Sequence, residues 1–228
     1  MAKQTAAPIL VFDVNETLLD LGHLEAVFVR LLGDRRSMRE WFAELILYSQ
    51  SLTLAGRYTP FNELAIATLR MRANIQAKTI TPSDAQAFAE ALGTMPALPD
   101  VAPALARLKT AGYRLVTLTN SPPGPAPSAL ENAGIGHYFE QAFSVHTLGQ
   151  FKPAPAVYHQ VAHALEVPTA ELCLVACHLW DTLGAQAAGM QGAFIERPGN
   201  AVLVAPEVPQ PTFVASDLMQ LADQLVRE

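Results

Sequence analysis

Residues 8–17 read Pro-Ile-Leu-Val-Phe-Asp-Val-Asn-Glu-Thr, a short apolar run that stops at a polar turn. A continuous apolar run of this length is typical of a strand buried on both faces of a parallel sheet. Runs of the same character recur farther along the chain and predict three more buried strands. They span residues 114–118, 172–176 and 192–195.

Helix-patterned segments separate these strands, with prolines or glycines where the helices would begin or end. The segments are 101–111, followed by Gly112; 126–133, followed by Gly134; 153–165, which opens with prolines; and 182–188, followed by Gly189. Strands that alternate with helices form parallel sheets with right-handed crossovers, and ligands bind at the carboxyl ends of the strands. We therefore expect an α/β fold, in which a Rossmann-like core holds a parallel β-sheet flanked by helices.

The stretch between the first two predicted strands breaks this alternation. It contains no convincing strand and indicates four helices, at 23–32, 37–55, 61–77 and 82–92. Helices inserted here would cover the edge of the sheet where ligands bind. We expect an inserted helical cap subdomain over residues 22–92, and a core made of residues 1–21 and 93–228. The proline-rich residues 121–127 would form a rim of the site.

Composition excludes several classes of protein. Half of the 228 residues are hydrophobic, and the net charge of −6, with no basic cluster longer than Arg35-Arg36, argues against nucleic acid as a partner. The N-terminal stretch lacks the longer apolar region of a signal peptide, and no apolar stretch approaches the ~20 residues of a membrane span. We expect a cytoplasmic protein with no membrane partner. Cys173 and Cys177, the only cysteines, are predicted to be buried thiols.

Four polar clusters lie where the carboxyl ends of the predicted strands would meet. They are Asp13-Val14-Asn15-Glu16-Thr17, Thr119-Asn120-Ser121, Lys152-Pro153 and His178-Leu179-Trp180-Asp181. A carboxylate, a hydroxyl, a lysine and a second carboxylate brought together are able to carry out nucleophilic displacement through an ester intermediate. Asp13 alone fits a helix N-cap as well, but that alternative explains neither Lys152 nor Asp181. The sequence therefore predicts that Asp13 is a nucleophile.

In order and spacing, the four clusters resemble the four motifs of the haloacid dehalogenase superfamily across nearly the whole chain. Several further phrases look most like its L-2-haloacid dehalogenase branch. These phrases are Arg57-Tyr58, Lys152-Pro153 followed by Val157-Tyr158, Trp180-Asp181 leading to Gly184-Ala185, and Arg197-Pro198-Gly199-Asn200. The resemblance implies hydrolysis of a short 2-haloalkanoic acid to the 2-hydroxy acid.

The resemblance also implies a role for each site residue. Asp13 would attack the carbon that bears the halogen, and water would then hydrolyse the aspartyl ester. Lys152 would hold Asp13 ionised, and Asp181 would hold Lys152. The remaining residues would contact the nucleophile, the substrate carboxylate or the departing halide. They are Thr17, Thr119, the backbone N–H groups of Val14 and Asn15, Asn120, Trp180 and Tyr158.

Most members of the superfamily are magnesium-dependent phosphatases, and two positions argue against that activity here. Asn15 stands where those enzymes have a second aspartate as general acid, and an amide cannot transfer a proton. Cys177 stands where they have an acidic magnesium ligand, although magnesium prefers hard oxygen ligands. We expect a reaction without metal or cofactor. A phosphatase acting on a small phosphate monoester, or a redirected protein that binds a small carboxylate, stays as an alternative.

Three departures from the dehalogenase pattern bear on the chemistry. Phe42 stands where the family has a halide-binding arginine, and Arg39, one helical turn away, is either its substitute or a solvated surface residue. Ala176 and His178 stand where the family has a serine and an asparagine that position water. Because imidazole titrates near pH ~6.5, His178 is a candidate base for ester hydrolysis. The third departure is Asn15, where tyrosine is common. Glu16 is expected to face solvent or to cap the following turn.

The sequence leaves several properties open. The preferred halogen, chain length and stereochemistry of the substrate have no visible signature. Related enzymes are commonly dimers, and the apolar helix predicted at 41–55 offers a self-complementary face, so a homodimer is expected without being established.

Overall fold

The computed structural model describes residues 7–124 and 127–226, and its centre is a parallel six-stranded sheet. The strands lie in the order β3-β2-β1-β4-β5-β6. Their bounds are Ile9–Phe12 (β1), Leu115–Thr119 (β2), Gln141–Ser144 (β3), Leu172–Ala176 (β4), Gln191–Ile195 (β5) and Phe213–Ala215 (β6). The four predicted strands are confirmed and occupy adjacent positions in the sheet. The sequence prediction missed β3 and β6, which are the two edges.

Register aligns the carboxyl ends of the central strands. Phe12 is opposite both Thr117 of β2 and Val175 of β4. The backbone N–H of the next residue, Asp13, donates to the carbonyl of Val175 at 3.0 Å. The side chain of Asp13 is therefore fixed at the end of the sheet, where parallel folds bind ligands.

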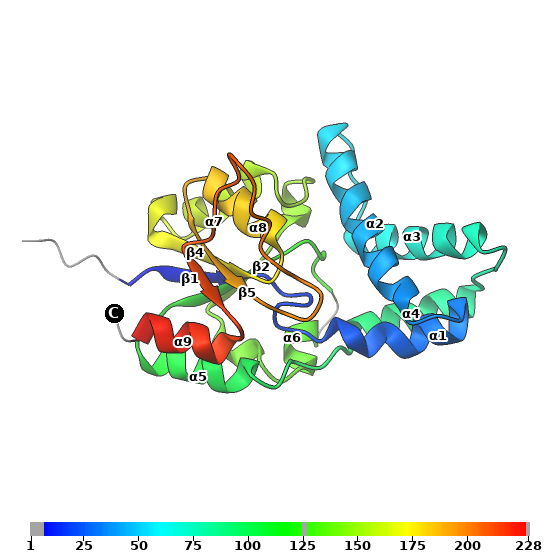
Figure 1. Ribbon diagram of the computed structural model, residues 1–228, viewed down its shortest axis with the longest axis horizontal. Helices are drawn as coiled ribbons and strands as arrows, with labels where there is room; N and C mark the ends of the chain where they lie inside the picture. Colours follow the sequence, from blue (N-terminus) through cyan, green and yellow to red (C-terminus); the bar gives the residue numbers. More distant parts are fainter. Residues whose placement is uncertain (1–6, 125–126, 227–228) are drawn as a thin grey trace, which may run out of the picture.

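Helices cover both faces of the sheet (Figure 1). On one side, α5 (Val101–Thr110) packs with α9 (Leu218–Val226); on the other, α7 (Pro155–Ala164) packs with α8 (Leu179–Ala187). The short α6 covers Ala129–Asn132. The α/β architecture expected from the sequence is confirmed. Helix α8 begins three residues earlier than predicted, so that His178 is its N-cap residue.

Four helices follow β1 and lie together beside the sheet (Figure 1). A single turn of 3-10 helix at Leu21–Leu24 leads into them. Their bounds are Glu25–Leu32 (α1), Arg36–Leu54 (α2), Phe61–Ile75 (α3) and Pro82–Gly93 (α4). The ring of Trp41 lies 5.3 Å from that of Phe28 and 5.2 Å from that of Phe88, so an aromatic cluster joins α1, α2 and α4.

These helices lie where the sequence predicted helices, but the division of the chain into cap and core domains stays a prediction. Within the described ranges, no helix has both the length and the apolar character needed to cross a membrane.

Candidate active site

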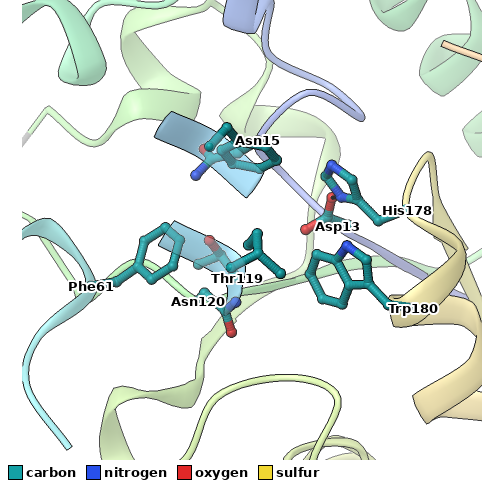
Figure 2. Close-up of a pocket in the computed structure, with 9 residues that line it drawn as sticks. Asp13, Asn15, Phe61, Thr119, Asn120, His178 and Trp180 are labelled. Atoms are coloured by element: carbon teal, nitrogen blue, oxygen red, sulfur yellow. Dashed lines mark hydrogen bonds and ion pairs between the residues drawn. The ribbon is translucent and has the colours of Figure 1, made fainter. Parts of the chain in front are cut away.

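A small pocket opens where the ends of β1, β2 and β4 face helices α2 and α3. It encloses about 240 Å³, including the part open to solvent. Figure 2 shows the rings of His178 and Trp180 beside Asp13, with Phe61 on the opposite side. The residues that line the pocket are Asp13, Asn15, Phe42, Ile46, Phe61, Thr119, Asn120, His178 and Trp180.

Asp13, Lys152 and Asp181, which we call the lysine triad, form an ion network behind this pocket. The Lys152 ammonium nitrogen lies 2.9 Å from Oδ1 of Asp13 and 2.7 Å from Oδ2 of Asp181. Lys152 and Asp181 are fully buried, and Asp13 is 6% exposed. Buried charges are tolerated only where they are paired, so each member of the lysine triad depends on the others.

Neighbouring side chains hold the lysine triad in place. The Tyr158 hydroxyl, also fully buried, donates to Oδ1 of Asp181 at 2.6 Å. The hydroxyl of Thr17 donates to Oδ2 of Asp13 at 2.7 Å. The Asn120 side-chain oxygen accepts from the backbone N–H of Lys152 at 3.0 Å. Three of the expected site residues therefore contact the lysine triad directly.

The pKa values of the lysine triad follow from burial and pairing. Burial alone would raise the pKa of Asp13, but Lys152 and His178 outweigh it and hold that pKa well below its usual range. Burial and the charge of Asp13 raise the pKa of Asp181, against the opposing effect of Lys152. Burial would lower the pKa of Lys152, but its two carboxylate partners raise it. Asp13 is therefore held ionised and in a fixed position, as a carboxylate nucleophile would need to be.

His178 links Asp13 to a second group of charges. Its Nδ1 lies 3.2 Å from Oδ2 of Asp13, and its Nε2 lies 2.9 Å from a carboxylate oxygen of Glu16. The imidazole is 5% exposed. Burial would lower its pKa, but the Cys177 thiol and hydrogen bonds to Asp13 and Glu16 raise the pKa of His178 well above its usual value.

Glu16 lies inside the protein, and the expectation that it faces solvent or caps a turn is wrong. It is 5% exposed, and its carboxylate pairs with both His178 and Arg39. Arg39 also donates to the carbonyl of Pro198 at 2.7 Å. Arg39 is thus neither an isolated surface residue nor one of the residues that line the pocket. We call Glu16, Arg39 and His178 the histidine network.

The wall of the pocket opposite the sheet is apolar. Phe42 and Ile46, four residues apart on α2, and Phe61, the first residue of α3, line the pocket together with Asp13. The ring of His178 lies 5.4 Å from that of Phe42 and is stacked at 5.0 Å on that of Trp180. Sequence reasoning missed Ile46 and Phe61; the helical spacing from Phe42 would have indicated Ile46, whereas Phe61 has no such signal.

Two predicted contact residues have partners outside the pocket or at its edge. The backbone carbonyl of Val14 accepts from the N–H groups of Leu18 and Leu19, and its side chain is buried. The Thr119 hydroxyl accepts from the backbone N–H of Ser121 at 3.1 Å. Thr119 lines the pocket, but Val14 does not.

One group of potential metal ligands occurs among the described residues. Atoms of Glu16, Cys177 and His178 lie within 4.8 Å of one another. A thiol and an imidazole do not suit magnesium, which prefers oxygen ligands. A softer ion would have to displace Arg39 from Glu16 and compete with the Glu16–His178 hydrogen bond. We therefore assign these side chains to hydrogen bonding and not to a metal site.

Cys173 and Cys177 are both free and buried, as predicted. Burial raises the pKa of the Cys173 thiol to about 12. Cys177 lies next to His178, and its backbone N–H donates to the Thr17 hydroxyl at 3.0 Å, which ties the end of β4 to the loop after β1.

An (S)-2-haloacid dehalogenase of Burkholderia cepacia is 29% identical over 83% of each chain, and one of Pseudomonas sp. (strain CBS-3) is 28% identical over 82% of this chain and 83% of its own length. The solved structure of the L-2-haloacid dehalogenase of Xanthobacter autotrophicus superposes with a TM-score of 0.86 at 26% identity, covering 96% of this chain and 98% of that one. The family model of the haloacid dehalogenase-like hydrolases matches residues 8–189 of this chain. The chain belongs to the haloacid dehalogenase-like hydrolase family.

Proposed function

We propose that this protein hydrolyses the carbon–halogen bond of a short 2-haloalkanoic acid and gives the 2-hydroxy acid through an ester on Asp13. The observation that carries the proposal is the buried contact between Lys152 and Asp13, which holds a carboxylate ionised at the floor of a pocket that has an apolar wall. A second Xanthobacter autotrophicus structure, 25% identical with a TM-score of 0.86, contains covalently bound chloropropionic acid.

The first step is displacement at carbon. One Asp13 oxygen forms a bond to the carbon that bears the halogen, and the halogen leaves with the electron pair as halide. No proton has to follow the halide, so the site needs a desolvated place for the anion and no general acid. The rings of Phe42, Phe61 and Trp180, which line the pocket, provide such a place, and Asn120 adds an amide donor at its edge.

The second step is hydrolysis of the aspartyl ester. Water attacks the ester carbonyl of Asp13, so that the oxygen of the product comes from the protein. His178 is placed to accept a proton from that water, because its Nδ1 lies 3.2 Å from Asp13. We assign it the role of general base.

Metal-independent chemistry is part of the proposal. A phosphatase of this family needs a proton donor for the leaving alcohol, and Asn15, which lines the pocket, has only an amide. In place of an acidic ligand, Cys177 offers a buried thiol. These two positions favour dehalogenation over phosphate ester hydrolysis.

We also propose that two copies associate through α2. Leu47, Tyr48 and Leu54 on this helix are exposed, with Leu54 at 90%. Exposed apolar side chains gathered on one helix suit burial against a second chain. The cytoplasmic location and the cap–core division expected from the sequence stay predictions.

One experiment tests the function directly. Purified protein is incubated with each enantiomer of 2-chloropropionate, with chloroacetate and with p-nitrophenyl phosphate, in the presence and absence of EDTA. We expect halide release that EDTA leaves unchanged and that Asp13→Asn abolishes. Phosphate release that EDTA abolishes, without halide release, would overturn the proposal and support the phosphatase.

A further inference from the structure

Glu16 has an unusual combination of backbone conformation and burial. Its φ of 65° lies in the left-handed region, which residues other than glycine seldom adopt. Its N–H donates to the Leu19 carbonyl at 2.9 Å, which closes the loop after β1. This conformation turns the carboxylate back toward His178, 162 residues away in the sequence. A strained position with a buried, paired side chain indicates a specific role.

Resting on the proposed function, we infer that Glu16 and Arg39 are positioning residues that make His178 the base of ester hydrolysis. Glu16 accepts from Nε2 of the imidazole and thereby points Nδ1 at Asp13. Arg39 shares the charge of the same carboxylate from the other side. The arrangement matches the principle by which a carboxylate orients the base of hydrolase triads.

In the resting protein His178 is surrounded by groups that favour its protonated form. Carboxylate oxygens of Asp13 and Glu16 lie 3.2 and 2.9 Å from the two ring nitrogens, the Cys177 thiol lies beside the ring, and the rings of Phe42 and Trp180 lie at 5.4 and 5.0 Å. The two carboxylates are themselves paired, Asp13 with Lys152 and Glu16 with Arg39. Because aromatic faces also attract cations, the resting imidazole is positively charged and is no base.

Formation of the ester removes one of the negative charges that stabilise the protonated form of His178. Alkylation makes Asp13 uncharged, so His178 loses one of the two carboxylates that hold its proton. The charge on Glu16 is partly neutralised by Arg39, so that this carboxylate alone does not prevent release of the proton. His178 therefore becomes a base only after the ester has formed, which is when a base is needed.

The protons balance over the cycle. The halide leaves as an anion, and His178 releases its proton to solvent. His178 then takes a proton from water, and the hydroxide forms a bond to Cγ of Asp13. The tetrahedral intermediate breaks its bond to the substrate oxygen, which takes the proton from His178 and leaves as the hydroxy acid. The regenerated Asp13 carboxyl returns its proton to His178.

The first test needs no substrate. In protein labelled with ¹⁵N-histidine, the titration of His178 is followed by NMR and assigned with His178→Asn. Asp13→Asn mimics the uncharged ester, and we expect it to lower the titration midpoint of His178 by about 1–3 pH units. In that background Glu16→Gln lowers the midpoint further, and Arg39→Gln raises it. An unchanged midpoint in Asp13→Asn would overturn the inference.

The second test follows single turnovers with (S)-2-chloropropionate. In Glu16→Gln we expect the halide burst to stay within about threefold of the wild-type rate, while ester hydrolysis slows by about 10²–10⁴-fold. The ester then accumulates and adds its mass to the intact protein. In Arg39→Gln we expect the pH dependence of ester hydrolysis to shift to higher pH, while the halide burst is not slowed. Loss of the burst in parallel with hydrolysis would overturn the inference, because Glu16 would then serve substrate binding.

Matched controls come from exposed ion pairs away from the site. Arg30→Gln removes the partner of Asp84, and Glu140→Gln removes the partner of Arg114. Both should leave burst, hydrolysis and the titration of His178 unchanged. Wild-type protein that releases no halide and forms no adduct with any 2-haloacid would reject the proposed function. The NMR result separates that outcome from failure of the inference itself.

Discussion

The two groups of charges on either side of Asp13 differ in burial and in their access to protons. In the lysine triad, Lys152 and Asp181 are fully buried, so its charges are fixed. The histidine network instead reaches the surface through Arg39, whose side chain is 44% exposed. In the proposed mechanism, the lysine triad would keep Asp13 ionised, and the histidine network would exchange protons as the charge on Asp13 changes.

Removal of Lys152 should have the largest effect, because it leaves two buried carboxylates without their cation. We expect Lys152→Met to lower the free energy of unfolding by about 3–5 kcal/mol and to abolish halide release. Urea unfolding and halide assays measure both effects. Lys109→Met, an exposed position on α5, is the control and should change neither. Full stability in Lys152→Met would show that the lysine triad is not a closed ion network.

The histidine network should respond to pH where the lysine triad does not. The pKa of His178 is higher in the folded state than in the unfolded state, where it is about 6.5. The protonated imidazole therefore stabilises the fold fully below the unfolded pKa, and this stabilisation is lost as pH rises through the folded pKa. At pH 6 we expect His178→Asn to cost about 2–3 kcal/mol of unfolding free energy, the value of a charged hydrogen bond.

The measurement is the difference in unfolding free energy between wild type and His178→Asn from pH 6 to pH 10. That difference should shrink as pH rises. A difference that grows with pH would contradict a charged imidazole in the resting protein. Lys152→Arg keeps a cation between Asp13 and Asp181 and is the comparison variant in the lysine triad. The difference in unfolding free energy between wild type and Lys152→Arg should not change between pH 6 and pH 10.

The two groups also differ in how far the sequence predicted them. Asp13 and the cluster that contains Asp181 follow apolar runs typical of buried strands, and Lys152 precedes a predicted helix. Because the carboxyl ends of parallel strands meet at one edge of the sheet, the sequence predicted that these three side chains lie together. Glu16 and Arg39 carry no comparable signal, since their pairing depends on one left-handed residue and on how α2 sits over the sheet. The edge strand β3 was missed for a related reason: only one of its four residues is buried, so its apolar pattern is weak.

Tyr158, which donates to Asp181 of the lysine triad, should have a smaller effect on stability than Lys152. Tyr158→Phe removes a donor to Asp181 that lies at 2.6 Å, but Lys152 stays in place. We expect a loss of about 1–2 kcal/mol in the free energy of unfolding. Burial raises the pKa of the phenol well above its usual value, so the loss should be equal at pH 7 and pH 9. Tyr48→Phe, on the exposed face of α2, is the matched control, and equal stability of the two variants would contradict the assigned role.

The smallest effect concerns the apolar wall of the pocket, which lies opposite Asp13 and His178. Phe42 packs against His178 and also limits the pocket, so Phe42→Leu should enlarge the space available to the substrate side chain. We expect the ratio of kcat/KM for 2-chlorobutyrate to that for chloroacetate to rise about tenfold, the usual value of one or two methylene groups in an apolar pocket.

Phe28→Leu, in the aromatic cluster of α1, α2 and α4, is the control: it removes a ring of the same size outside the pocket and should lower stability without changing the ratio. A ratio unchanged in Phe42→Leu would mean that the pocket is limited by Ile46, Phe61 and Trp180. The position where the family has an arginine would then act only through the imidazole that it contacts.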